Sequence, residues 1–186
     1  MKLSEIANVS DDSNMVATLK KHCGEYISII KHDLAKPLYR GFRNTHSDMS
    51  IIEPRVDRKP KDTSWAIHNT LNEYFKQRFG YPYRNGIFAV SDGYTANNYG
   101  TTHVIFPIGT LHYIWSPHIA DIFEFIDDLT SNDFTDDQVM RRIERELPWY
   151  INKNLSDAIE LEHEVMLANK CYVLTYPTYQ RISTLL

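Results

Sequence analysis

One stretch near the C-terminal end, residues 160–174, decides the fold: it reads ELEHEVMLANKCYVL. With a period of two, Glu160, Glu162 and Glu164 fall on one face of a strand and apolar residues on the other. Three neighbouring carboxylates repel one another, which costs stability unless water, a cation or a ligand compensates. The apolar runs VML and CYVL then predict two strands joined by a turn. The stretch therefore predicts a carboxylate cluster that leads directly into β-structure.

A helix is the alternative for the first part of this stretch. Ser156 can cap a helix in which Glu160 and Glu164 lie one turn apart on a solvated face. Spacing alone leaves both interpretations open, so the choice depends on the rest of the chain.

Size and composition set broad limits on the protein. The 186 residues fit one domain that buries roughly two-thirds of the surface of its unfolded chain. A net charge of -4 gives no overall basic surface for nucleic acid. Cys23 and Cys171 lie in apolar patterns, which predicts buried thiols in a reducing compartment. No apolar run approaches the roughly 20 residues of a membrane span, so we expect no membrane partner and a cytoplasmic location.

The remaining patterns predict helices and strands in alternation. Helices are expected over residues 14–33, from a cap at Thr63 or Ser64 to Gly80, from Pro117 through Ile126, and from Asp133 or Thr135 to Pro148. Strands are expected over residues 37–42 and 87–90, and in a hairpin of residues 101–107 with 111–115. Residues 42–61 are expected to form an irregular loop with a basic part that contains Arg55, Arg58, Lys59 and Lys61. His68 lies on an apolar helix face and is expected to be a satisfied core histidine.

Residues 37–42, PLYRGF, place an arginine in an apolar strand. Arg40 must find an anion or carbonyl groups there, because arginine does not give up its charge. An ordinary edge-strand arginine is the alternative. Gly41 beside it suits close approach of the backbone to a ligand.

Residues 85–100, NGIFAVSDGYTANNYG, predict a turn, a strand and a short helix. Ser91 or Asp92 is expected to begin the helix, which ends at Gly100. Ser91 thus stands at the end of a strand.

In this order the three segments resemble elements of the ADP-ribosyltransferases. EHEVML resembles the Glu-x-Glu element of the arginine-modifying toxin type, and LYRG its first-strand arginine. The segment around Ser91 is similar to the Ser-Thr-Ser element of that branch, although Ala89 and Val90 precede it. GIFA followed by ANNY is similar to the tyrosine segment of the poly(ADP-ribose) polymerases, in which Arg40 would replace a histidine. Together these elements span residues 37–174.

The resemblance implies an α+β fold, a split mixed β-sandwich of the ADP-ribosyltransferase type with an N-terminal helix and flanking helices. Two small sheets would enclose an NAD cleft. The chain would be a single domain, 1–186, with an N-terminal helical segment, 1–35, and an NAD-binding catalytic core, 36–186.

The function that the resemblance implies is mono-ADP-ribosyl transfer. NAD would be the substrate, no metal would be needed, and ADP-ribose would pass to a protein side chain such as arginine or to a nucleic acid. Glu164 would stabilise the cationic ribose, Glu162 would hold or activate the acceptor, and Ser91 would orient Glu164. The residues expected to bind NAD are Arg40, Gly41, Phe88, Ser91, Tyr94 and Tyr99. The host would be a bacterial cell, with the protein encoded by a phage or used as a toxin.

Three other functions stay open. With water as acceptor the protein would be an NAD glycohydrolase. Because the serine element is reduced, it could also be a non-catalytic binding or inhibitor module on the same fold. The basic segment 55–61 points to a third alternative, in which NAD chemistry modifies a nucleic-acid base.

Overall fold

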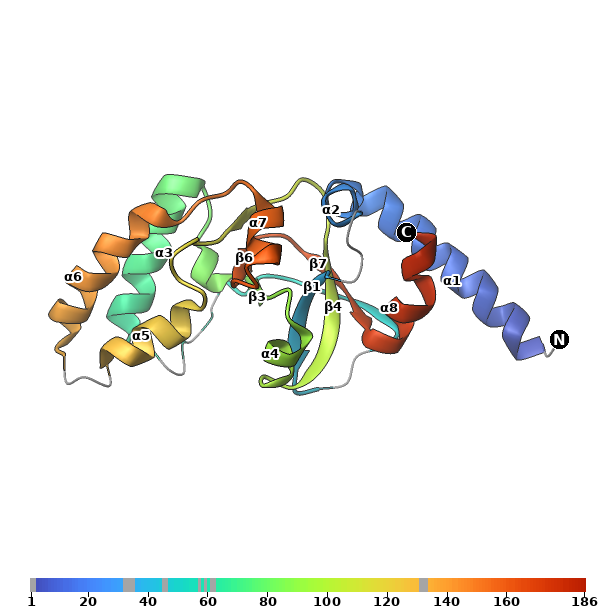
Figure 1. Cartoon of the computed structure of the whole chain (residues 1–186), viewed down its shortest axis with the longest axis horizontal. Coiled ribbons are helices and arrows are strands. Elements are labelled where there is room, and N and C mark those ends of the chain that lie inside the picture. The colour runs from blue at the N-terminus through green and yellow to red at the C-terminus, as the bar shows by residue number, and fades with distance from the viewer. Residues whose placement is uncertain are drawn as a thin grey trace. The chain divides into compact units, whose positions relative to one another are not determined.

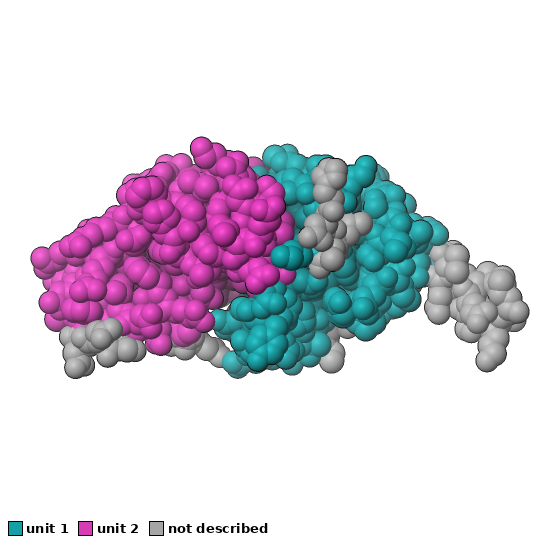
Figure 2. All heavy atoms as spheres, in the orientation of Figure 1, with its two compact units in different colours: residues 1–52, 92–111, 170–186 teal, residues 53–91, 112–169 magenta. Residues whose placement is uncertain are grey.

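A computed structural model describes residues 3–31, 36–44, 47–56, 58, 60, 63–130 and 134–186 (Figure 1). They form a mixed α+β structure with two antiparallel sheets. The chain divides into two compact units (Figure 2): unit 1 comprises Met1–Ile52, Asp92–Leu111 and Lys170–Leu186, and unit 2 comprises Glu53–Ser91 and His112–Asn169. The coarse α+β class is thus as expected, whereas the single domain of 1–186 stays a prediction.

Unit 1 is built on a four-stranded sheet in the order β1-β4-β7-β2, in which every neighbouring pair is antiparallel. Its elements are α1 (Leu3–His22), α2 (Gly24–Ile30), β1 (Leu38–Phe42), β2 (Met49–Ile52), α4 (Gly93–Asn97), β4 (Thr101–Pro107), β7 (Cys171–Thr175), α8 (Tyr176–Ile182) and the 3-10 turn η3 (Ser183–Leu185).

The helices of unit 1 are tied to this sheet through aromatic side chains. The hydroxyl of Tyr26 in α2 accepts a hydrogen bond of 2.6 Å from the Leu38 amide in β1. The Tyr26 ring meets Phe106 of β4 edge-on at 5.6 Å, and Tyr179 of α8 lies 6.0 Å from the same ring. Both cysteines, Cys23 and Cys171, are buried free thiols in this unit, as predicted.

Unit 2 combines a three-stranded antiparallel sheet, β3-β6-β5, with a helical cluster. Its elements are α3 (Trp65–Phe79), the 3-10 turn η1 (Tyr83–Asn85), β3 (Ile87–Ala89), β5 (Tyr113–Ile114), α5 (Ile122–Thr130), α6 (Asp136–Glu146), the 3-10 turn η2 (Leu147–Trp149), α7 (Leu155–Glu160) and β6 (Val165–Leu167).

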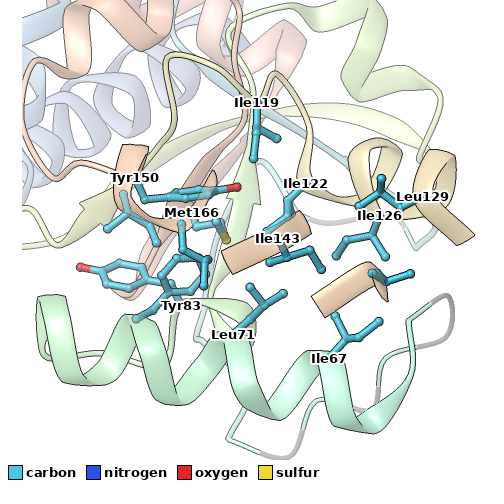
Figure 3. Close-up of a cluster of buried hydrophobic side chains, with 14 residues drawn as sticks. Ile67, Leu71, Tyr83, Ile119, Ile122, Ile126, Leu129, Ile143, Tyr150 and Met166 are labelled. Atoms are coloured by element: carbon cyan, nitrogen blue, oxygen red, sulfur yellow. The ribbon is translucent and has the colours of Figure 1, made fainter. Parts of the chain in front are cut away.

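The core of unit 2 lies where α3, α5 and α6 meet its small sheet (Figure 3). Apolar residues repeat every three or four positions on each helix, as in Leu71 and Phe75 of α3, so each helix presents one apolar face. Tyr150 points its hydroxyl toward the side of the cluster where Ile119 and Ile122 lie (Figure 3).

Local signals predicted several helix ends correctly. The Ser64 side chain accepts a hydrogen bond from the Ile67 amide at the start of α3, and Gly80 ends that helix with φ 89°. Thr135 and Gln138 form a capping box at the start of α6. Asp92 caps α4 by accepting from the amides of Tyr94 and Thr95.

The predicted hairpin of residues 101–107 with 111–115 is wrong. β4 pairs with β1 and β7 in unit 1, whereas β5 pairs with β6 in unit 2. Each strand finds partners that are distant in sequence, and the turn signals between the two do not encode that choice.

Three further boundaries differ from the sequence prediction. Residues 42–61 are not a continuous loop, because β2 lies within them and pairs with β7. α5 begins at Ile122 rather than Pro117, since Asp121 accepts hydrogen bonds from the amides of Phe123 and Glu124. The N-terminal helix is two helices, α1 and α2, that meet at Cys23. Residues 32–33, Lys59, Lys61 and Asp133 lie outside the described residues.

Candidate functional site

The predicted carboxylate stretch is neither a strand face nor a continuous helix. α7 ends at Glu160, a turn follows, and β6 begins at Val165. Glu162 lies in the turn with a left-handed φ of 59°, so the alternation of a strand is broken there. The helix has Asn154, not Ser156, at its N-cap position. Only Glu164 leads directly into β-structure, and both interpretations of Glu160, Glu162 and Glu164 as a single face are wrong.

The turn before Glu164 is fixed by backbone hydrogen bonds. The Glu164 amide donates to the Ala120 carbonyl at 2.7 Å, and the His163 amide donates to the Ala158 carbonyl at 3.0 Å. The Nδ1 atom of His163 also lies 2.8 Å from the carbonyl oxygen of Ser116. These contacts hold Glu164 beside the segment that leads into α5.

The Glu164 carboxyl lies at the first turn of α5. Glu164 is half-buried, and its Oε1 accepts a long hydrogen bond of 3.5 Å from the amide of Ile122, the first residue of α5. A helix N-terminus favours a negative group. Asp121 already occupies this position, because its Oδ1 accepts from the amides of Phe123 at 2.7 Å and Glu124 at 3.2 Å. Two carboxyl groups therefore share one helix N-terminus.

This environment raises the pKa of the Glu164 carboxyl from its ordinary 4.5 to about 8. Burial is the largest cause, and the negative charge of Asp121 acts in the same direction, whereas Arg84 and Arg58 oppose it. Burial and the Glu164 charge also raise the pKa of Tyr150 well above its usual range. Near neutral pH the Glu164 carboxyl is therefore mostly protonated, and an approaching cation would favour its ionised form.

Ser91 is buried directly after β3, and its hydroxyl group donates a hydrogen bond to the backbone. Its Oγ donates a 2.6 Å hydrogen bond to the carbonyl oxygen of Ile159 in α7. The contact anchors the end of β3 to α7, the helix that precedes Glu162 and Glu164. Ser91 can thus orient the carboxylate turn through the backbone, and its expected role of orienting Glu164 stays a prediction.

Phe88 in β3 lies beside two arginines. The guanidinium carbon of Arg58 lies 4.2 Å from the centroid of its ring, and that of Arg84 lies 5.3 Å from it. Arg58 also donates from Nη1 to the Gly86 carbonyl at 3.3 Å. Two arginines of the predicted basic segment thus differ. Arg58 contacts residues around β3, and Arg55 is exposed.

Sequence reasoning missed Arg84 and Asp121, which act electrostatically on Glu164, and Tyr150, on which Glu164 acts. Arg84 is 7% exposed, and burial lowers its pKa while Glu164 and Asp121 act to raise it. The signal was present: Arg84 lies between Tyr83 and an Asn-Gly turn in an apolar context. The reasoning applied to Arg40 would have selected it too.

The other predicted residues belong to unit 1. Arg40 lies in β1, is half-buried, and has its guanidinium carbon 5.6 Å from the Phe42 ring centroid. A Cβ atom on Gly41 would collide with the Ala96 carbonyl oxygen and the Gly100 amide nitrogen. Gly41 is therefore needed for packing against the backbone beside α4, and its expected approach to a ligand stays a prediction.

Tyr94 and Tyr99 are exposed in the same unit. The exposed fraction is 80% for Tyr94 in α4 and 51% for Tyr99 just after it. Arg40, Gly41, Tyr94 and Tyr99 thus lie in unit 1, and Phe88, Ser91, Glu162 and Glu164 in unit 2. Their convergence on one NAD molecule stays a prediction.

Comparison with protein-family models, curated proteins and solved structures gives no significant match to this chain. Within the described residues, no group of three or more His, Cys, Asp or Glu side chains is arranged to hold a metal ion. None of the described helices has both the length and the apolar character to cross a membrane.

Proposed function

We propose that the chain is a mono-ADP-ribosyltransferase that cleaves the nicotinamide–ribose bond of NAD and transfers ADP-ribose to a macromolecule. The observation that carries the proposal is the position of Glu164, an enclosed carboxyl directly before β6 and two residues after the exposed Glu162. The order of the arginine, serine and Glu-x-Glu segments along the chain supports it, as do two separate antiparallel sheets.

Cleavage of the nicotinamide–ribose bond is favoured by a carboxylate at the position where positive charge develops. As the C1′–N bond breaks, its electron pair leaves with nicotinamide, which becomes neutral, and the ribose takes on oxocarbenium character. A carboxylate in an enclosed site stabilises that charge more than one in water does. Glu164 would act there, and Glu162 would accept the proton that the acceptor nitrogen or oxygen loses when it attacks C1′.

The raised pKa of Glu164 gives this mechanism a distinct pH dependence. The free protein holds Glu164 mostly protonated at neutral pH, because its pKa is about 8. The cation in NAD binds better to the ionised form. We therefore expect kcat/KM to rise with pH and to level off above about 8, since kcat/KM reports ionisation of the free enzyme.

Transfer of label from NAD carrying a labelled adenylate to a bacterial lysate tests the proposal. Wild type should label a macromolecule, and Glu164→Gln should lower the rate at least about 100-fold, the lower end for loss of a charge-stabilising group. Glu160→Gln, which alters an exposed carboxyl at the end of α7, is the matched control. Equal transfer by wild type and Glu164→Gln would refute the proposal. Free ADP-ribose without labelled macromolecule would assign NAD glycohydrolysis instead.

One observation favours a second candidate, a non-catalytic binding module. The Ser91 hydroxyl donates to the backbone carbonyl of Ile159. Ser91 is also the only hydroxyl residue left of the serine element in this sequence. Calorimetry with NAD distinguishes the two functions, because a transferase must bind NAD and a module that has lost turnover and cofactor does not.

A further inference from the structure

Three buried polar atoms in unit 2 have no hydrogen-bond partner among the described residues: Nδ1 of His68, Oδ1 of Asn72 and Nε of Arg84. His68 and Asn72 lie one turn apart on α3 and both contact Asn85, and the charge of Arg84 acts on His68. A buried polar atom without a partner costs about 1–3 kcal/mol. Such a cluster therefore points to a polar ligand.

Nε2 of His68 has two contacts that require opposite roles. Nδ2 of Asn72, 3.0 Å away, can donate to Nε2 only if Nε2 is an acceptor, whereas Oδ1 of Asn85, 3.2 Å away, can accept from Nε2 only if Nε2 carries the ring proton. Nδ1 of His68 is therefore a donor in one tautomer and an acceptor in the other. Burial and the charge of Arg84 lower the pKa of His68, so the ring is neutral. The group thus offers a donor at Arg84 Nε and an acceptor at Asn72 Oδ1, and the role of His68 Nδ1 depends on the tautomer.

Arg84 keeps an Nε without a hydrogen-bond partner in the described part of the chain, although the charges of Glu164 and Asp121 act to favour its ionised form. Its guanidinium and that of Arg58 lie beside the same Phe88 ring. The Asp121 carboxyl already accepts hydrogen bonds from two amides of α5. The carboxyl of Glu164, with a pKa of about 8, is mostly uncharged at neutral pH. A buried charge is costly unless it is paired. An anion that accepts from Nε of Arg84 would satisfy this donor and pair with the charge directly.

We propose that Arg84, together with Arg58 and Phe88, forms an anion site in unit 2 that binds a phosphate group of a small-molecule ligand. Guanidinium groups match phosphate oxygens through paired N–H donors. Two arginines also suit a group that carries about -1.5 to -2 charges at neutral pH. The site lies wholly within unit 2 and does not depend on the proposed transferase function.

Nuclear magnetic resonance of the arginine side chains tests the site on the wild-type protein. The Nε–H signal of Arg84 is assigned as the one that Arg84→Lys removes. Titration with inorganic phosphate should shift this signal in a saturable way and slow its exchange with water. The Nε–H of Arg142, an exposed arginine 4.1 Å from the Phe134 ring, should not move. An Arg84 signal that stays unmoved, or moves only in parallel with that of Arg142, would overturn the site.

Calorimetry with variants gives a second readout. Phosphate affinity should fall at least about tenfold in Arg84→Lys and Arg84→Met and stay within twofold of wild type in Arg142→Met. Acetate should bind more weakly than phosphate, and equal binding would overturn the phosphate assignment. A wild-type protein that transfers ADP-ribose but binds no phosphate would refute this site alone. Phosphate binding without any transfer would support this site and refute only the proposed function.

Discussion

The ionisation of Glu164 follows from its enclosure and not from the residues beside it in the sequence. Glu160 and Glu162 are exposed carboxyls a few positions away, whereas Glu164 is half-buried beside Asp121 at the start of α5. A carboxyl whose pKa is raised on folding binds a proton in the native state that the unfolded chain releases. The stability that Glu164 contributes is therefore complete below its ordinary pKa of 4.5 and is lost as pH rises to about 8.

Replacing Glu164 with Gln should flatten the dependence of stability on pH. Between about pH 5 and 8 the free energy of unfolding of wild type should fall relative to that of Glu164→Gln, by at most about 1.4 kcal/mol per pH unit. Urea denaturation at several pH values measures the difference. The free energy of unfolding of Glu160→Gln should change with pH as that of wild type does. If the free energy of unfolding of Glu164→Gln also changes with pH in this way, the raised pKa of Glu164 is contradicted.

Ser91 makes a buried contact that can be removed with little change in volume. Ser91→Ala should lower the free energy of unfolding by about 1 kcal/mol, the typical net value of one hydrogen bond. The loss stays at that level because the Ile159 carbonyl also accepts from the Glu162 amide at 3.3 Å. Ser28→Ala removes an exposed hydroxyl contact to the Glu25 carbonyl and should change stability by less than about 0.5 kcal/mol. Equal effects in the two variants would show that burial of Ser91 contributes nothing.

Among the elements, β1 and α4 pack at a distance that only glycine permits. A Cβ atom at Gly41 meets backbone atoms of Ala96 and Gly100, which cannot move aside as a side chain can. Gly41→Ala should therefore destabilise unit 1 by about 1–3 kcal/mol or more, as overpacking does. At Gly24, the first residue of α2, a Cβ meets nothing within 4 Å.

Gly24→Ala is the matched control, and it should leave stability unchanged or raise it by up to about 1 kcal/mol. Urea denaturation followed by circular dichroism measures both variants. A neutral Gly41→Ala would mean that β1 and α4 separate without cost.

The sequence predicted elements where the signal was local and failed where it was not. Ser64, Thr135 and Asp92 cap helices through contacts within three residues, so their chemistry could be predicted directly. Strand partners depend on residues far away, which is why the hairpin of 101–107 with 111–115 failed and β2 was missed. Arg84 itself had a local signal, but its electrostatic partners Glu164 and Asp121 are distant in sequence and could not be predicted.

At the scale of the whole molecule, the chain passes between the two units four times, after Ile52, Ser91, Leu111 and Asn169. Two of these passages divide the motifs on which the resemblance depends. Ser91 ends a stretch of unit 2 and Asp92 begins one of unit 1, while β6 and β7 belong to different units. Neighbours in sequence therefore belong to different units, and a function that needs both units cannot be deduced from either unit alone.

The proposed transferase predicts that NAD affects the peptides that carry Arg40 and those that carry Glu164 in one binding event. Hydrogen exchange should slow on addition of NAD in the peptides that carry Arg40 and in those that carry Glu164. Because a single ligand would cause both changes, the two should share one half-saturating NAD concentration. Arg40→Lys keeps the charge but loses the paired donors of the guanidinium, and it should shift both midpoints to the same higher concentration. Protection confined to the peptides of one of these residues, or two different midpoints, would refute the NAD roles proposed for Arg40 and Glu164. The anion site at Arg84 would be unaffected, because the phosphate titration tests it separately.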